Sequence, residues 1–205
     1  MGICLRAQGL TAGVVEPVGL TIDLVGAERV DELRELWLAL HNHHRDTAVL
    51  PLVADDEESW QRRRATYLAW LSAGEALLLL ATIDNQPIGY AMVLLHLGPD
   101  DTWPVGDRYA EVYSLSVAAG LRGRGIGSRL LDPVDDELRG LGISDLQVAV
   151  MAGNSDALRF YERRGLRAGE ITLYRFGIKG RTLSGRPELP LLAEVAIEPQ
   201  HGHKA

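Results

Sequence analysis

The stretch Leu121-Arg122-Gly123-Arg124-Gly125-Ile126-Gly127-Ser128 decides the fold of this chain. It follows a β-branched, apolar run over 112–117 that is typical of a strand, and it precedes apolar residues at helical spacing over 130–138. A glycine-rich turn from strand into helix binds anions, because glycines admit a close backbone approach and the first helical N–H groups favour negative charge. Arg122 and Arg124 add guanidinium donors that suit phosphate. The pattern predicts a phosphate or pyrophosphate site.

Spacing distinguishes three glycine-rich devices that bind phosphates. A P-loop requires a Lys-Ser/Thr pair after its last glycine, and neither Gly125 nor Gly127 is followed by one. A dinucleotide fingerprint requires G-x-G-x-x-G and an acidic residue at the end of the next strand, which the run over 146–150 lacks, so it is disfavoured. The third device is Arg/Gln-x-x-Gly-x-Gly. Arg122, Gly125 and Gly127 match it, and it resembles the acetyl-CoA loop of the GNAT N-acetyltransferase superfamily.

A second motif supports the same resemblance. Asn154 follows an apolar run and precedes a helical pattern that carries Ala157 and Tyr161 and ends at Gly165. The resemblance covers residues 77–176, with both motifs in the family's order. It implies an α/β (α+β) GNAT fold, in which a mixed, mainly antiparallel sheet is splayed at its centre and helices cover both faces.

Periodicity and turn residues divide the chain into a tail over 1–18, a domain over 19–179 and a tail or strap over 180–205. Within the domain, Pro133 predicts a kinked or shortened helix after the glycine-rich loop. The expected strands cover 20–24, 76–83, 88–97, 111–117, 145–151 and 171–176, and the expected helices cover 27–44, 55–73, the run from the loop to 139, and 155–164.

Composition restricts the partners and the compartment. A net charge of −7 argues against general nucleic-acid binding and is compatible with cationic amine acceptors. The lone cysteine, Cys4, excludes an intramolecular disulfide and favours a reducing compartment. No apolar run approaches the roughly 18 residues of a membrane span, and the N-terminus lacks a signal-peptide pattern. We expect a cytoplasmic protein with neither nucleic-acid nor membrane partners.

The resemblance implies a role for each motif toward acetyl-CoA. The pyrophosphate lies on Arg122-Gly123-Arg124-Gly125-Ile126-Gly127-Ser128, and the pantetheine arm pairs with the backbone of Leu115, Ser116 and Val117 in a bulged strand. Asn154 caps its helix, binds the cofactor arm, or does both. Tyr161 is the expected general acid, because a phenol is protonated at neutral pH and can give its proton to the coenzyme A thiolate.

The sequence assigns the general base less specifically than the general acid. Glu111 begins the strand before the loop, where many family members place a glutamate that deprotonates the amine directly or through water, and an ordinary solvated glutamate fits equally well. Strict alternation would place Glu111, Tyr113 and Leu115 on one face of this strand.

Three histidines, His41, His43 and His44, end the first helical pattern, where capping is expected. No metal site is expected, because the neighbouring sequence supplies no further ligand pattern. In this fold the first two helices usually wall the acceptor pocket, so we expect four lining residues: His44, Trp60, Tyr67 and Trp103.

These features predict an N-acetyltransferase that moves the acetyl group of acetyl-CoA directly to a primary amine of a small molecule, peptide or protein, without an acyl-enzyme. Two alternatives remain open: a non-catalytic acyl-CoA-binding sensor of the same fold, and a protein that holds ATP on the loop. A homodimer is compatible with the resemblance. The identity of the acceptor does not follow from these motifs.

Overall fold

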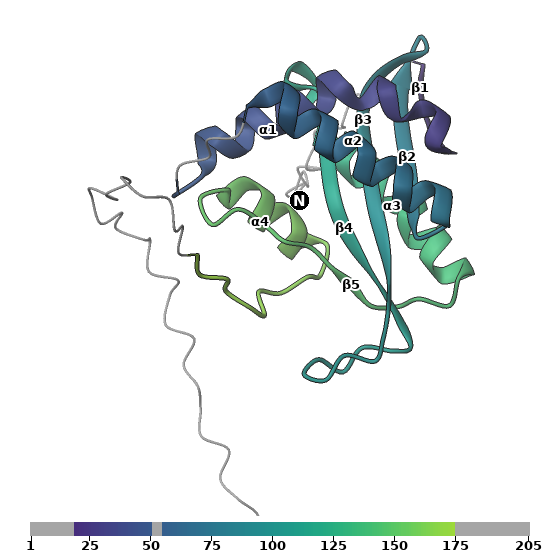
Figure 1. Cartoon of the computed structure of the whole chain (residues 1–205), viewed down its shortest axis with the longest axis vertical. Coiled ribbons are helices and arrows are strands. Elements are labelled where there is room, and N and C mark those ends of the chain that lie inside the picture. The colour runs from purple at the N-terminus through teal and green to yellow at the C-terminus, as the bar shows by residue number, and fades with distance from the viewer. Residues whose placement is uncertain (1–18, 51–54, 175–205) are drawn as a thin grey trace, which may run out of the picture. The chain divides into compact units, whose positions relative to one another are not determined.

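A computed structural model describes residues 19–50 and 55–174 of the chain. Its five strands form a sheet in the order β1-β2-β3-β4-β5, with antiparallel neighbours except for the parallel pair of β4 and β5 (Figure 1). The strands are β1 (Leu20–Val25), β2 (Ala76–Ile83), β3 (Gln86–Leu97), β4 (Arg108–Val117) and β5 (Leu146–Gln147). The helices are α1 (Arg34–Thr47), α2 (Asp56–Ala73), α3 (Ile126–Gly140) and α4 (Ser155–Arg163), with 3-10 segments η1 (Ala27–Leu33) and η2 (Ala119–Leu121). The mixed, mainly antiparallel sheet is therefore confirmed.

Local signals set the ends of α2 as the sequence predicts. Asp55 Oδ1 accepts hydrogen bonds of 3.0 Å from the N–H groups of Glu57 and Glu58, so Asp55 is the N-cap. Gly74 ends the helix in a left-handed conformation with φ of 71°.

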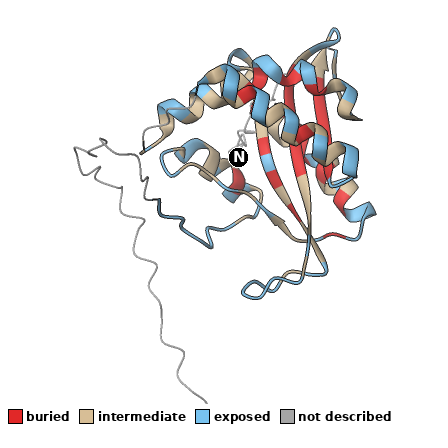
Figure 2. Cartoon of the chain, viewed as in Figure 1, coloured by how far each residue is buried: buried red, intermediate tan, exposed pale blue. Residues whose placement is uncertain are grey.

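Helices cover both faces of the sheet, and each face has its own core (Figure 2). Leu78 and Leu80 of β2 pack with η1, α1 and α2, whereas Leu79 and Ala81 pack with α3 on the opposite face. We call these the α2-side core and the α3-side core. The continuous apolar run of β2 follows from burial on both faces.

A β-bulge interrupts β4 at Tyr113. Ser114 pairs with Met92 and Val112 pairs with Val93, so Tyr113 has no opposite residue on β3. The extra residue inverts the alternation beyond it. Glu111 and Tyr113 face the α2 side, while Leu115 packs in the α3-side core. The prediction that these three residues share a face is wrong for Leu115, because it assumed a regular pleat.

The sheet splays between β4 and β5. Only Ala110–Leu146 and Glu111–Gln147 are paired, and the described residues beyond Gln147 form no ladder with β4. The predicted strand over 145–151 is therefore wrong for its second half. Its apolar residues Val148 and Val150 instead pack against the α3-side core without strand pairing.

Helix α3 runs through Pro133 without being shortened. Pro133 lacks the N–H that would bond the carbonyl of Arg129. The helix continues because its inward face, formed by Leu130, Leu131, Val134 and Leu138, is buried against the sheet. The prediction of a shortened helix is wrong, since tertiary packing outweighs the local cost, and the alternative of a kink stays a prediction.

The chain divides into two units, one ending at Arg167 and the other beginning at Ala168, and every helix and strand above belongs to the first. Residues 168–174 of the second unit are exposed and contain no strand, so the strand predicted over 171–176 is wrong for 171–174. Residues 175–176, the boundary at 179 and both expected tails lie outside the described residues. None of the described helices is long and apolar enough to cross a lipid bilayer.

Candidate active site

The glycine-rich loop joins β4 to α3 and ends in the first turn of that helix. Gly123 and Gly125 have φ of 74° and 79°, a left-handed conformation that costs other residues about 1–2 kcal/mol. Gly125 is the N-cap of α3, and no side chain of the described residues caps this end. The N–H groups of the first turn are therefore available to an anion.

The two arginines of the loop have different surroundings. Arg122 Nε donates a 3.1 Å hydrogen bond to the carbonyl of Val117, which ties the loop to the end of β4. Arg124 is exposed and has no hydrogen-bond or ion-pair partner among the described residues. Of the two predicted phosphate donors, Arg124 is thus the one without a structural role in the loop.

The outer edge of β4 is open beyond the splay. Residues 112–117 pair with β3 on one side and with no described strand on the other. The side chains of Leu115 and Val117 pack in the α3-side core, and Ser116 Oγ donates a 2.8 Å hydrogen bond to the carbonyl of Leu36. Over 115–117 the side chains are thus engaged and the backbone of the outer edge is open, and an extended ligand can add to it as a strand would.

Helix α4 lies beside β5 at this edge of the sheet (Figure 1) and is fixed against α3. Arg164 donates hydrogen bonds of 3.0 Å to Asp132 and 2.6 Å to Asp135 of α3. Gly127 lies beside α4, because a Cβ there would be in ordinary contact with the ring of Phe160 at 3.5 Å. The first turn of α3 and the side of α4 therefore meet next to the loop.

The N-terminus of α4 meets α1. Asn154 Oδ1 accepts a 3.1 Å hydrogen bond from the N–H of Ala157, which makes Asn154 the N-cap as the sequence predicts. Its Nδ2 lies 3.4 Å from Nε2 of His43 on α1. Capping and the contact with His43 give Asn154 a structural function that requires no ligand.

Tyr161 lies on α4 and is 8% exposed, within the α3-side core. Burial raises the pKa of the Tyr161 phenol well above its ordinary value, so the group stays protonated throughout the physiological range. The Tyr161 hydroxyl has no hydrogen-bond partner among the described residues. It is also not one of their fully buried polar atoms, so solvent or a ligand can contact it. A protonated, accessible phenol is what a general acid requires.

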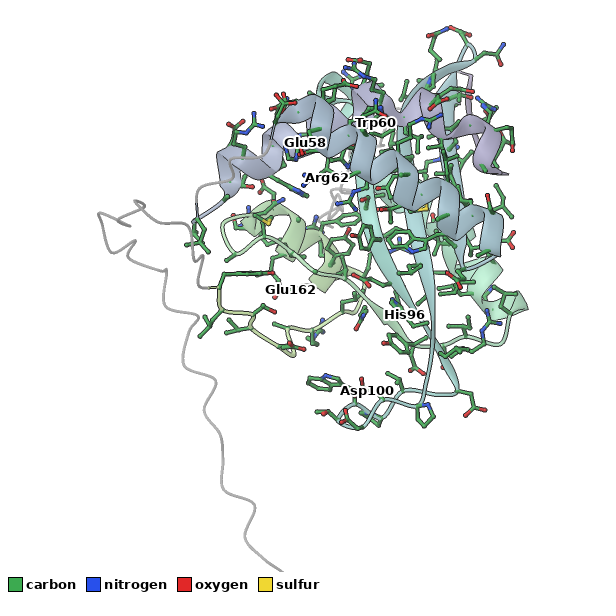
Figure 3. The ribbon with its side chains drawn as sticks, in the orientation of Figure 1. Glu58, Trp60, Arg62, His96, Asp100 and Glu162 are labelled. Carbon is green, nitrogen blue, oxygen red and sulfur yellow. The ribbon has the colours of Figure 1, made fainter. Side chains whose placement is uncertain are left out.

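Glu111 is half-buried at the point where β4 and β5 separate. Its Oε2 lies 3.0 Å from Nε2 of His96 on β3, and the ring of His96 stacks on Tyr109 with centroids 4.7 Å apart. Figure 3 labels His96 on its strand, away from the helices above. His96 was not predicted, because its contact with Glu111 follows only from the register between β3 and β4.

A shallow pocket of about 260 Å³ opens on the α2 side of the sheet, close to the bulge. Its lining comes from α1, α2 and β4: Trp37, His41, Ser59, Arg62, Arg63, Thr66 and Tyr113. The guanidinium carbon of Arg63 lies 4.6 Å from the ring centroid of Tyr113 and 5.6 Å from that of Tyr67, within the range of cation–π contacts. Arg63 was not predicted. Its signal is a charged residue at helical spacing between Trp60 and Tyr67, on the inward face of α2.

The four residues expected to line the acceptor pocket do not line this pocket. Trp60 and Tyr67 are 2% and 0% exposed and fill the core instead. Neither His44 nor Trp103 is among the lining residues. Helical spacing identifies the inward face of α2, but the bulky side chains at its centre become core and their neighbours at its margin form the wall.

The three histidines of α1 have separate surroundings. His41 stacks on Trp37 at 4.8 Å, and His43 faces Asn154. Burial, followed by the charges of His43, His41 and Arg63, lowers the pKa of His44. Within the described part of the chain, no three potential metal ligands come together.

Comparison with known proteins identifies a family with which this chain shares its sequence pattern. The model of the acetyltransferase (GNAT) family matches residues 33–166. A mycothiol acetyltransferase from Renibacterium salmoninarum is 28% identical over 184 residues, which cover 75% of this chain and 53% of that protein. The chain thus spans about half the length of this curated relative.

Solved structures agree in fold. A GCN5-related N-acetyltransferase from Ralstonia eutropha has a TM-score of 0.63 at 15% identity and covers 77% of this chain and 99% of its own. An aminoglycoside N-acetyltransferase in complex with CoA has a TM-score of 0.61 at 16% identity, with 78% and 95% covered. A putative acetyl transferase from Pyrococcus furiosus has a TM-score of 0.61 at 24% identity, with 76% and 98% covered. On the family match over most of its length, this chain belongs to the acetyltransferase (GNAT) family.

Proposed function

We propose that this protein is an acetyl-CoA-dependent N-acetyltransferase that moves the acetyl group directly to a primary amine. The observation that carries the proposal is the open edge of β4 over residues 112–117, which leads from Glu111 to the glycine-rich loop. An extended thioester ligand with a pyrophosphate at one end matches this edge and the uncapped first turn of α3. The family match supports acetyl transfer.

The residues at this edge divide the binding of acetyl-CoA among them. The backbone of Leu115, Ser116 and Val117 pairs with the pantetheine arm, and the N–H groups of Gly125 to Ser128, with Arg124, hold the pyrophosphate. Bound acetyl-CoA supplies an activated acetyl group as its thioester.

Two side chains handle the protons of the transfer. The amine nitrogen forms a bond to the acetyl carbon while the carbon–sulfur bond breaks. Glu111 accepts the proton that the amine loses, directly or through water, and Tyr161 donates a proton to the departing sulfur. His96 orients the Glu111 carboxylate through their 3.0 Å contact. Because the amine attacks the thioester directly, no acyl-enzyme forms and Cys4 has no part in this scheme.

The test is release of free coenzyme A thiol from acetyl-CoA by the full-length chain, with a panel of primary amines. Amine-dependent thiol release above the rate of hydrolysis supports the proposal. Thermal unfolding gives a second readout, because a ligand at about 100 times its Kd stabilises a protein by roughly 2.7 kcal/mol. This corresponds to a rise in Tm of about 5–10 °C for a chain of this size.

The two readouts separate the alternatives. Stabilisation by acetyl-CoA without thiol release from any amine would favour a non-catalytic acyl-CoA sensor. Stabilisation by ATP and not by acetyl-CoA would favour a nucleotide-binding protein and overturn the proposal. Size-exclusion chromatography with light scattering tests the homodimer in the same preparations.

A further inference from the structure

Arg63 is an uncompensated cation among aromatic rings. It follows Trp60 by three residues and precedes Tyr67 by four, so it lies on the inward face of α2. Its guanidinium carbon is 4.6 Å from the ring centroid of Tyr113, 5.6 Å from that of Tyr67 and 6.0 Å from that of Trp37. Aromatic rings hold the guanidinium in place but do not neutralise its charge.

The neighbours of Arg63 in the sequence are both neutralised. Arg62 pairs with Glu58 one turn earlier, on the exposed side of α2 where Figure 3 labels both residues. Arg64 pairs with Asp31 of η1. Arg63 forms no ion pair with any described carboxylate. One arginine of the three therefore keeps its charge available to a ligand.

The pocket around Arg63 contains no acidic side chain. Its lining carries the uncompensated Arg63, Arg62 with its charge paired to Glu58, the polar Ser59 and Thr66, and no aspartate or glutamate. A polycationic ligand would meet net repulsion here, whereas a carboxylate would find the planar guanidinium fork that binds its two oxygens. The volume of about 260 Å³ is below the roughly 300–1,000 Å³ of pockets for drug-sized ligands.

The pocket and the proposed base share strand β4. Tyr113, which lies under the guanidinium of Arg63, is two residues from Glu111 on the same face of β4. Residues two apart on a regular strand have Cα atoms about 6–7 Å apart, and the bulge at Tyr113 bends the strand between them. Because Arg63 stacks on a residue so near to Glu111 in the strand, an acceptor that reaches both side chains would be short.

We propose that Arg63 binds the carboxylate of the acceptor, and that the acceptor is a small amino acid or a close analogue with its amine a few bonds from the carboxylate. The inference rests on the proposed function of this site and narrows its acceptor. This class of acceptor differs from the cationic amines with which the acidic net charge of the chain is compatible, because the charge inside the pocket is positive.

The experiment compares pairs of acceptors in which an uncharged carboxamide replaces the carboxylate, and Arg63 variants separate the effect of this charge from the lower basicity of the carboxamide's amine. Free L-amino acids and their carboxamides share the amine and the side chain, and thiol release from acetyl-CoA measures kcat/KM for each. We expect the best amino acid to exceed its carboxamide by roughly 10- to 100-fold, the effect of a charge-assisted hydrogen bond. Arg63→Met should abolish this preference, and Arg63→Lys should retain part of it.

The matched control is Arg64→Met, the same substitution one residue away, at a position outside the pocket. It should leave both the preference and the KM for acetyl-CoA unchanged. Equal Tm values for the Arg63 and Arg64 variants exclude unfolding as the cause of a lost preference. Carboxamides used as well as amino acids, or a preference that survives Arg63→Met, would overturn the inference while leaving N-acetyl transfer intact.

Calorimetric titration with N-acetyl amino acids and their carboxamides needs no turnover. Arg63-dependent binding of the carboxylate form without thiol release from any amine would support the carboxylate site and refute amine acetylation. The absence of any difference between the two forms would overturn the carboxylate site.

Discussion

The hydrogen bond between Tyr67 and Ser114 should hold α2 to the bulge of β4, and its removal should be measurable as lost stability. The Tyr67 hydroxyl donates to Ser114 Oγ at 2.6 Å, and the two residues are 0% and 7% exposed. In Tyr67→Phe, Ser114 Oγ loses its donor where water does not replace it. An orphaned buried polar group costs about 1–3 kcal/mol, so the free energy of unfolding should fall by that amount.

A double-mutant cycle isolates this bond. Ser114→Ala alone leaves the Tyr67 hydroxyl with only its 3.5 Å contact to the Tyr90 hydroxyl, whereas the double variant removes both atoms of the bond. The double variant should therefore cost less than the two single variants together, with a coupling energy on the order of 1–2 kcal/mol. Urea unfolding followed by tryptophan fluorescence is a suitable assay, because Trp70 lies 6.2 Å from the ring of Tyr67. Each kcal/mol should also appear as about 2–4 °C in Tm.

An exposed pair of hydroxyls provides the control. Thr21 and Thr82 on β1 and β2 lie 2.9 Å apart at the surface, so water replaces either partner. The cycle of Thr21→Val and Thr82→Val should give a coupling within about 0.5 kcal/mol of zero. If the coupling of Tyr67 and Ser114 is as small as that of the threonines, burial does not set the strength of this bond and the argument fails.

Three further predictions concern the loop, the proton transfers and pH. Gly125→Ala should lower the free energy of unfolding by about 1–2 kcal/mol, and Gly125→Asn should lower it less because asparagine tolerates positive φ; equal losses in urea unfolding would contradict this. Tyr161→Phe and Glu111→Gln should each reduce kcat for thiol release by roughly 10²–10⁴-fold with little change in the KM for acetyl-CoA, and an intact kcat in either variant would remove that residue from the mechanism. Because burial lowers the pKa of His44 below 6.5, the unfolded chain takes up this proton first, and the free energy of unfolding should fall as pH decreases from 6.5 through the lowered value. Tm measured from about pH 8 to about pH 5 should fall less in His44→Gln than in the parent chain, and parallel curves would show that His44 does not titrate differently on folding.

The parts of the fold that depend on local signals follow from the sequence. Asp55 caps α2, Asn154 caps α4 and Gly125 begins α3, because each places a specific residue type where a helix end needs it. The hairpin of β2 and β3 likewise turns at Asp84 and Asn85, both with positive φ.

The parts of the fold that depend on pairing between distant segments do not follow from the sequence. A single extra residue at Tyr113 moves Leu115 to the opposite face; the family resemblance implies a bulge in this strand, but no local pattern marks its position. The loss of pairing after Gln147 depends on the separation of two strands and not on the propensity of either. His96 and Arg63 acquire their functional surroundings only when β3, β4 and α2 come together.

The donor half and the acceptor half of the proposed site lie against different cores, on opposite faces of the sheet, so they should be open to separate redesign. The glycine-rich loop and α4 pack with the α3-side core, whereas Arg63 and its pocket lie over the α2-side core. Variants with substitutions at Ser59, Arg63 and Thr66 should therefore change the acceptor specificity while the affinity for acetyl-CoA stays constant. Tyr113 is the exception: it faces the pocket from the bulge of the strand that binds the donor, so changes there should alter both halves together.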